Sequence, residues 1–432
     1  MNNFKNGFKC YIDNLKCNKS YCISLFIKVG SYLEKPSEKG ISHFLEHMLF
    51  KGTRKYKNLA NLLDINGFQY NALTMKECTL FYIKSTNILL LPLIVDILYE
   101  IAFHSTLDKS LFENEKTVVK DEILEDQSDM NTLLFDMSEK LMFNQKYYDK
   151  PIHSYDYKIT GSKHDIDVLT LDNVMSFYER YYKINNMFMV CTGNLNDSNI
   201  LLALKNTFLK EKVQFLPPYI RKKTLINNRD YILYDKLYSD EGNSGVVIIN
   251  YPICGFNNKD RYILNLFSFI LTKGISSELF ELLRNKNGIV YSIESSTDIY
   301  YRYFGLFNIS FTTNQQNIFK ALSLILNFLK NDISEKQLNK AKILYIEEIN
   351  FSNEDIVNKG EMIGLNILYD SPVLSTVEIE QEINKVSIND IYRIKKKYIV
   401  NNKMVLVHMS NIDNLDFEDF MLDNDNFMLD NE

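Results

Sequence analysis

The chain has few of the residues from which proteins build disulfide frameworks. Its 432 residues include only six cysteines, which are scattered rather than grouped. So sparse a set excludes the framework of a small secreted domain. We therefore expect free thiols at Cys10, Cys17, Cys22, Cys78, Cys191 and Cys254. No signal or transit pattern begins the sequence, so we predict a bacterial-type cytoplasmic location, with an organelle matrix as the alternative.

Long hydrophobic runs and extended positive charge are also missing. The most apolar run, 88–103, contains Pro92, Asp96 and Glu100, so we expect a buried helix and no membrane span. The net charge is −6, and eight acidic residues without a basic one lie in 413–432. The rest of the chain is close to neutral and has no broad basic region, which argues against a nucleic-acid partner. We interpret 413–432 as a solvated or disordered acidic tail, with a short docking element for a partner as the alternative.

The two halves of the chain follow one plan. The segments 171–182 and 388–398 both read as amphipathic helices, and each precedes an Asn-Asn pair and an apolar strand, at 187–191 and 404–408. A repeat of this length indicates a duplicated domain rather than a solenoid. We place the zinc-binding catalytic domain at 1–212, a linker at 213–225, and a homologous domain without zinc at 226–412.

Strand and helix patterns alternate within each half. The adjacent strand patterns 288–295 and 303–312 predict a hairpin, and 318–330 has the spacing of an amphipathic helix. Hairpins mixed with helices favour an α+β fold. We predict two homologous domains, each a largely antiparallel sheet packed with helices.

Histidine is as scarce as cysteine, yet two of the six histidines stand in the pattern His43-x-x-Glu46-His47. On a helix, with Ser42 as the expected N-cap, His43 and His47 lie one turn apart on one face. That spacing suits two neighbouring positions on a tetrahedral zinc ion. Glu46 faces the same way and can accept a proton from metal-bound water. A chance match is rare in so histidine-poor a chain, so the motif predicts a zinc hydrolase. We expect the other histidines to be structural or surface residues: His104, His153, His164 and His408.

A catalytic zinc ion takes three protein ligands and keeps one position open. The third ligand must come from outside the motif. Glu115 and Glu122 lie seven positions apart, which is two turns on one helix face. Either can point at the metal while the other supports the site from behind.

The inverted motif, a glutamate about 75 residues later and the duplicated halves resemble the pitrilysin and mitochondrial processing peptidase family. Gly30 and Glu34 before the motif and Gly52-Thr53 after it also match. The resemblance covers nearly the whole chain and is to small, single-unit members like the processing peptidase β subunit. It implies a metalloprotease half-clamshell with one zinc ion per chain. It also implies Glu122 as the third ligand and Glu115 as the supporting acid.

Two further segments match the family. Asn71-Ala72-Leu73-Thr74 resembles the segment that leads into an edge strand pairing with substrate, near 71–81. Lys76-Glu77-Cys78 departs from the usual polar stretch that follows it. In the second half, 280–292 resembles a stretch whose Arg and Tyr, here Arg284 and Tyr291, hold the substrate carbonyl and stabilise the oxyanion. The second half has 261–266 where the zinc motif would stand, so only one half binds zinc.

These features predict a zinc endopeptidase of unfolded peptides or presequence-like segments, with Glu46 as general base. Long family members close two such units around a chamber. A single unit therefore implies a homodimer, or a heterodimer with an inactive paralogue, in which Arg284 and Tyr291 act in trans. The alternatives are a non-catalytic core subunit of a larger complex and a maturation peptidase for small peptides.

Overall fold

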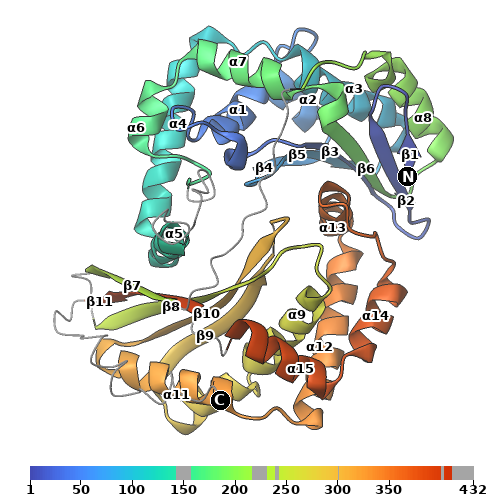
Figure 1. The fold of residues 1–432 in the computed structure, drawn as a ribbon. Coiled ribbons are helices and arrows are strands. Elements are labelled where there is room, and N and C mark those ends of the chain that lie inside the picture. Colours follow the sequence, from blue (N-terminus) through green and yellow to red (C-terminus); the bar gives the residue numbers. More distant parts are fainter. Residues whose placement is uncertain (143–156, 217–230, 239–242, 300, 400–402, 411–432) are drawn as a thin grey trace. The chain divides into compact units, whose positions relative to one another are not determined.

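The computed structural model describes residues 1–142, 157–216, 231–238, 243–299, 301–399 and 403–410 (Figure 1). These residues form two sheets packed with helices, which confirms the predicted α+β class. None of the helices in these ranges is long and apolar enough to cross a bilayer. All six cysteines are free thiols. The predicted tail at 413–432, most of the predicted linker at 213–225, and His153 lie outside the described residues.

The first sheet has the order β1-β2-β6-β3-β5-β4. Its pairs are antiparallel except β2 with β6, which run parallel. Its strands are β1 (Asn2–Asn3), β2 (Lys9–Asn14), β3 (Tyr21–Ile27), β4 (Gln69–Thr74), β5 (Thr79–Ser85) and β6 (Met187–Gly193). Its helices are α1 (Ile41–Leu49), α2 (Leu59–Ile65), α3 (Leu91–His104), α4 (Lys109–Ser128), α6 (Lys163–Val168), α7 (Leu171–Tyr181), α8 (Asp197–Asn206) and α13 (Ile356–Leu368).

The second sheet has the order β7-β11-β8-β10-β9 and again one parallel pair, β7 with β11. Its strands are β7 (Tyr231–Tyr238), β8 (Ser244–Cys254), β9 (Val290–Asp298), β10 (Phe304–Asn314) and β11 (Lys403–Ser410). Its helices are α5 (Met130–Met142), α9 (Asp260–Thr272), α10 (Glu278–Phe280), α11 (Ile318–Lys330), α12 (Glu335–Glu354), α14 (Thr376–Lys385) and α15 (Ile388–Ile394). In both sheets the closing strand follows a capped helix, α7 or α15, as the repeat predicts.

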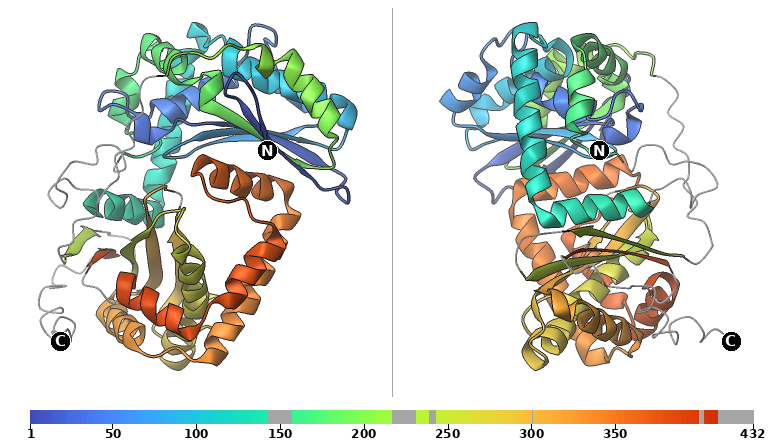
Figure 2. Two further views of the ribbon diagram at one scale, coloured as in Figure 1. Left: turned by 45° about the vertical axis from the view of Figure 1, so that its right-hand side comes forward. Right: turned by 90° about the vertical axis from the view of Figure 1, so that its left-hand side faces the viewer.

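The chain divides into two compact units, and each unit is built from three separate stretches of the sequence. The first comprises the described residues within Met1–Asp126, Ile152–Lys222 and Phe351–Val373; the second comprises those within Gln127–Pro151, Lys223–Asn350 and Leu374–Glu432. Helix α5 thus packs on β8 and β11 of the second sheet, and α13 packs on β3 and β6 of the first (Figures 1 and 2). The domain boundaries that the sequence repeat suggested, at residues 212 and 226, stay a prediction.

Every residue of β3 and β6 is buried, because helices cover both faces of the first sheet. On one face, apolar side chains such as Ile23 and Leu25 join the main core with α1 and α3. On the other face, α13 approaches closely, and Thr192 Oγ1 donates to the Ile356 carbonyl at 2.7 Å. A sheet covered on both faces is a firm support for the helix that carries the zinc motif.

Candidate metal centre

A buried carboxylate holds the first turn of α1, the helix that carries the motif. Glu34 accepts backbone hydrogen bonds from the N–H groups of Gly40 at 2.8 Å and Ser42 at 2.9 Å. Gly40 is the N-cap, with φ of 78°, a value that favours glycine. The prediction of Ser42 as N-cap is therefore wrong. N–H groups at the start of a helix have no partner within the helix, and here Glu34 accepts hydrogen bonds from two N–H groups at this end. Burial raises the pKa of Glu34 to about 8, although these hydrogen bonds oppose it.

Three potential ligands converge beside α1. The rings of His43 and His47 have centroids 4.6 Å apart. Glu122 of α4 faces both rings, with Oε1 3.6 Å from His43 Nε2 and Oε2 3.5 Å from His47 Nε2. Within the described parts of the chain, no other group of three or more His, Cys, Asp or Glu side chains brings its ligand atoms within 4.8 Å of one another.

These separations fit a tetrahedral zinc ion. Zinc bonds to nitrogen and oxygen are about 2.1 Å long, so two ligand atoms at the tetrahedral angle lie about 3.4 Å apart. The observed separations of 3.5 and 3.6 Å, each measured to a different oxygen of Glu122, are close to that value. Burial and, to a lesser extent, the neighbouring His47 lower the pKa of His43 to about 4. The His43 ring is therefore neutral at neutral pH and can offer a lone pair to a metal.

Glu115 lies behind His47 on the side away from Glu122. Its Oε1 is 2.9 Å from His47 Nδ1, and its Oε2 is 2.5 Å from Lys51 Nζ. Burial opposes ionisation of Glu115, but the hydrogen bonds from His47 and Lys51 outweigh burial and lower its pKa. An ionised Glu115 accepts the Nδ1 proton of His47, which leaves Nε2 free to face Glu122.

Glu46 lies beside the ligands and is only 9% exposed. Its Oε2 accepts a hydrogen bond from Thr74 Oγ1 at 2.6 Å. Burial raises the pKa of Glu46, an effect that the Thr74 hydrogen bond and His47 oppose and that Glu122 reinforces. A carboxylate with a raised pKa takes up a proton more readily, which is the property that a general base needs near neutral pH.

The strand that contains Thr74 is the outermost strand of the first sheet. β4 pairs only with β5 among the described strands, so no strand in the described part of the chain pairs with its other side. Asn71 is exposed on β4, whereas Ala72 and Thr74 are buried beneath it. Phe81, at the end of the predicted pairing segment, belongs to β5, an inner strand. The open strand edge near α1 is therefore β4 itself.

Two models of known protein families match the chain. The family model described as "Insulinase (Peptidase family M16)" matches residues 12–154, and the one described as "Peptidase M16 inactive domain" matches residues 169–345. The chain belongs to peptidase family M16. This confirms the resemblance to the pitrilysin family that the motif and the duplication indicated.

Several bacterial proteases are similar to this chain over most of its length. An "Uncharacterized zinc protease" of Rickettsia felis is 28% identical over 406 residues, which cover 91% of this chain and 93% of the relative. Among solved structures, a protease from Helicobacter pylori has a TM-score of 0.84 at 20% identity and covers 94% of this chain and 98% of its own. The periplasmic protease PqqL from Escherichia coli has a TM-score of 0.80 at 15% identity and covers 99% of this chain but only 49% of its own.

The second M16 unit brings Arg284 and Tyr291 together. Arg284 lies in a π-helical turn, Glu281–Lys286, and its Nη1 donates to the Tyr291 carbonyl at 2.8 Å. Tyr291 lies near the start of β9 and is 59% exposed. In this unit, 261–266 lies within α9, which has no histidine. The second unit therefore holds the Arg284 side chain on the backbone of an exposed tyrosine, on a surface without the zinc motif.

The structure adds two residues that the motif alone did not identify. Lys51 pairs with Glu115, and Thr74 donates to Glu46. Lys51 lies just after α1, which ends at Leu49, and its partner Glu115 is on α4, so spacing along the sequence does not predict the pair. Thr74 is distant in sequence from Glu46, and only the packing of α1 against β4 makes their contact.

Proposed function

We propose that this M16 protein is a zinc endopeptidase that holds one zinc ion per chain with His43, His47 and Glu122. The observation that carries the proposal is the convergence of these three side chains beside the buried carboxylate of Glu46. Two imidazoles and one carboxylate form a donor set known from catalytic zinc sites. Bacterial relatives are named as zinc proteases, which supports zinc as the metal.

A bound zinc ion would supply Lewis acidity to a peptide carbonyl and to water. The protein contributes the proton transfers. Glu46 takes a proton from the attacking water, holds it on a buried carboxylate whose raised pKa favours the protonated form, and delivers it to the leaving amine. Thr74 keeps the Glu46 carboxylate in one orientation. Glu115 and Lys51 keep His47 in the tautomer that presents Nε2.

The substrate class follows from β4. An extended peptide can add as a strand to an open sheet edge and present its backbone to groups beside that edge. β4 carries Asn71, Ala72 and Thr74, and Thr74 contacts Glu46 directly. We therefore propose unfolded peptides or presequence-like segments as substrates, since a folded chain cannot supply a free extended strand.

Assembly is part of the proposal. PqqL contains this chain's fold in about half of its length, which supports a pair of such units as the working form. We propose a homodimer, or a heterodimer with an inactive paralogue, in which Arg284 and Tyr291 serve the partner's zinc site. The bacterial relatives support a cytoplasmic location, with an organelle matrix as the alternative.

Two other functions compete. A non-catalytic core subunit would not require an intact set of zinc ligands, and the intact set argues against it. A maturation peptidase for small peptides would differ only in substrate.

Digestion of a diverse peptide mixture, followed by mass spectrometry, tests the proposal. We expect internal cleavages that a chelator abolishes and zinc restores. Absence of cleavage in a zinc-loaded sample would favour the non-catalytic subunit. Cleavage that the chelator does not affect would contradict the metal centre.

A further inference from the structure

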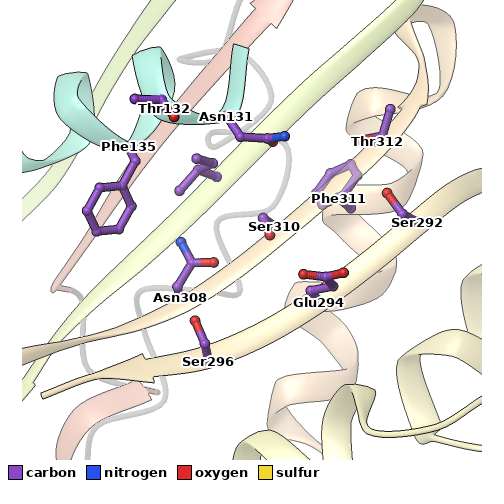
Figure 3. A pocket seen from close by; sticks show the side chains of 11 residues that line it. Asn131, Thr132, Phe135, Ser292, Glu294, Ser296, Asn308, Ser310, Phe311 and Thr312 are labelled. Atoms are coloured by element: carbon purple, nitrogen blue, oxygen red, sulfur yellow. The ribbon is translucent and has the colours of Figure 1, made fainter. Parts of the chain in front are cut away.

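The second unit contains a polar cavity that the proposed reaction does not use. Its volume is about 450 Å³, and it lies between the first turns of α5 and the sheet strands β8, β10 and β9 (Figure 3). That volume is within the range of sites that bind small ligands, so it can also hold one side chain of a bound peptide. All of its lining residues belong to one unit, so the cavity is a property of that unit alone.

Strand alternation makes the floor of the cavity polar. Every second residue of a strand points to the same face. On β9 and β10 the residues of this face carry hydroxyl, amide or carboxylate groups: Ser292, Glu294, Ser296, Asn308, Ser310 and Thr312. The intervening residues Ile293 and Ile309 are buried. The polar face is therefore continuous across two neighbouring strands.

A chain of hydrogen bonds determines which atom Asn308 presents. Ser138 on α5 donates from Oγ to the Phe135 carbonyl at 3.0 Å, so its oxygen accepts from Asn250 Nδ2 at 2.5 Å. Asn250 Oδ1 then accepts from Asn308 Nδ2 at 3.0 Å. This order leaves Asn308 Oδ1 turned toward the cavity, as Figure 3 shows. Asn308 is only 8% exposed, so this acceptor is held rigidly at the cavity floor.

The charge of the cavity lining favours a cationic occupant. Glu294, an exposed side chain, is the charged residue in the lining, and among the described residues no lysine, arginine or histidine lines the cavity. A phosphate or a carboxylate would meet an anion and a fixed acceptor, with no cation to pair with. A metal ion of the calcium or magnesium kind is also a poor occupant, because only one carboxylate is offered in a volume far larger than an ion. A cationic group with several N–H donors satisfies both acceptors and the hydroxyls.

We propose that this cavity binds the guanidinium or ammonium group of an arginine or lysine side chain on a bound peptide. Glu294 pairs with the charge, Asn308 Oδ1 accepts one N–H group, and the hydroxyls of Ser292, Ser296 and Ser310 accept others. The cavity is then a subsite for a basic residue, separate from the residues of the metal centre. The peptide as ligand depends on the proposed peptidase function; the preference for a cation depends only on the cavity.

Peptide binding tests the proposal. The zinc-loaded chain with Glu46→Gln, which stops turnover, is titrated into fluorescein-labelled peptides of Ala, Ser and Gly with both ends blocked. One peptide contains a single arginine, and its partner contains citrulline, which has nearly the same shape without the charge. We expect the arginine peptide to bind at least ten-fold more tightly. Glu294→Gln should remove most of that preference, and Ser310→Lys should do the same by placing a tethered ammonium group in the cavity.

Glu335→Gln is the matched control, because Glu335 is an exposed glutamate of the same unit on α12, outside the cavity. It should keep the full preference. Equal affinity for the arginine and citrulline peptides would overturn the proposal, as would a preference that survives both Glu294→Gln and Ser310→Lys. Chelator-sensitive cleavage of the citrulline peptide by the unaltered chain reports separately on the peptidase function. An active peptidase without a charge preference refutes only the subsite, and a charge preference without cleavage refutes only the peptidase.

Discussion

The imidazole of His47 lies between two carboxylates, with Glu115 on Nδ1 and Glu122 facing Nε2. His43 has no comparable support, since its Nδ1 is buried without a hydrogen-bond partner among the described residues. The orientation of one proposed ligand therefore depends on Glu115 and its partner Lys51. The ionised state of Glu115 also makes His47 a stronger base toward a metal.

Replacing Glu115 should weaken zinc binding without removing a ligand. Glu115→Gln keeps the size of the side chain but loses the charge that pairs with His47 and Lys51. We expect zinc affinity to fall by about ten-fold or more, as for other supporting residues of zinc sites. Competition with a chromophoric chelator measures the change. Glu113→Gln is the control, because Glu113 is on the same helix with its side chain 77% exposed; an unchanged affinity of Glu115→Gln relative to this control would contradict the assigned role.

Much of the candidate metal centre could be predicted from residue spacing. One helical turn separates His43 from His47, so any helix at this position brings them together. Glu115 and Glu122 were harder to distinguish because two full turns place both on the same face of α4. Their roles depend on how α4 packs beside α1, which spacing along one helix does not contain. The contact between Thr74 and Glu46 could not be predicted from the sequence, because it depends on how β4 packs beside α1.

At the scale of single elements, Asp260 connects the first turn of α9 to the region around α15. It is 7% exposed and accepts hydrogen bonds from Tyr398 at 2.9 Å and Lys397 at 3.1 Å, with Arg393 Nη2 at 2.8 Å. Burial raises the pKa of Asp260, but these three partners outweigh burial and lower it. The folded form therefore favours the ionised carboxylate.

A lowered folded-state pKa means that the stabilisation is present above the unfolded pKa, about 3.9 for aspartate, and is lost as the pH falls through the folded pKa. At pH 7 we expect Asp260→Asn to lower the free energy of unfolding by about 2 kcal/mol. The deficit should shrink below about pH 4, where the original chain also loses the charge. Urea unfolding across pH measures both; a deficit that is the same at every pH would show that the charge is not the cause.

Helix α13 approaches the first sheet at two glycines one turn apart. A Cβ added at Gly364 would lie 2.0 Å from the Phe26 ring, whereas one at Gly360 would lie 3.3 Å from Thr192 Oγ1. Alanine gains about 1 kcal/mol of helix propensity over glycine at either position. Overpacking costs about 1–3 kcal/mol where there is no space. We expect Gly364→Ala to destabilise the protein and Gly360→Ala to be neutral or stabilising, as measured by chemical denaturation; equal effects would contradict this account of the packing.

Individual elements were more predictable than their partners. The apolar run at 88–103 is the buried helix α3, preceded by a short 3₁₀ turn, and the hairpin of β9 and β10 forms as predicted. The sequence did not show which sheet α5 and α13 pack against. Apolar periodicity shows which face of a helix is buried, but it does not show which of two similar sheets covers that face. A duplicated chain makes the two choices nearly equivalent in sequence.

At the scale of the whole molecule, the proposed dimer predicts complementation. If Arg284 and Tyr291 serve the partner's zinc site, a Glu46→Gln chain still supplies an intact Tyr291, and a Tyr291→Phe chain still supplies an intact Glu46. Each homodimer should be nearly inactive, whereas a heterodimer contains one complete site. Mixed chains should therefore recover up to about half of the activity per heterodimer, as measured by peptide cleavage.

Co-purification through two different tags shows whether heterodimers form. Recovered activity in those heterodimers supports action in trans. Heterodimers without activity would contradict it, and so would a strictly monomeric chain that cleaves peptides at full rate.

The most direct test of the metal centre as a peptidase site combines zinc content and cleavage in the Glu46→Gln chain. The three ligands are untouched by this change, so inductively coupled plasma analysis should still find one zinc ion per chain. Peptide cleavage should fall by at least about a hundred-fold, because the group that moves the proton is gone. A Glu46→Gln chain that keeps its zinc and cleaves peptides at the original rate would contradict the central claim.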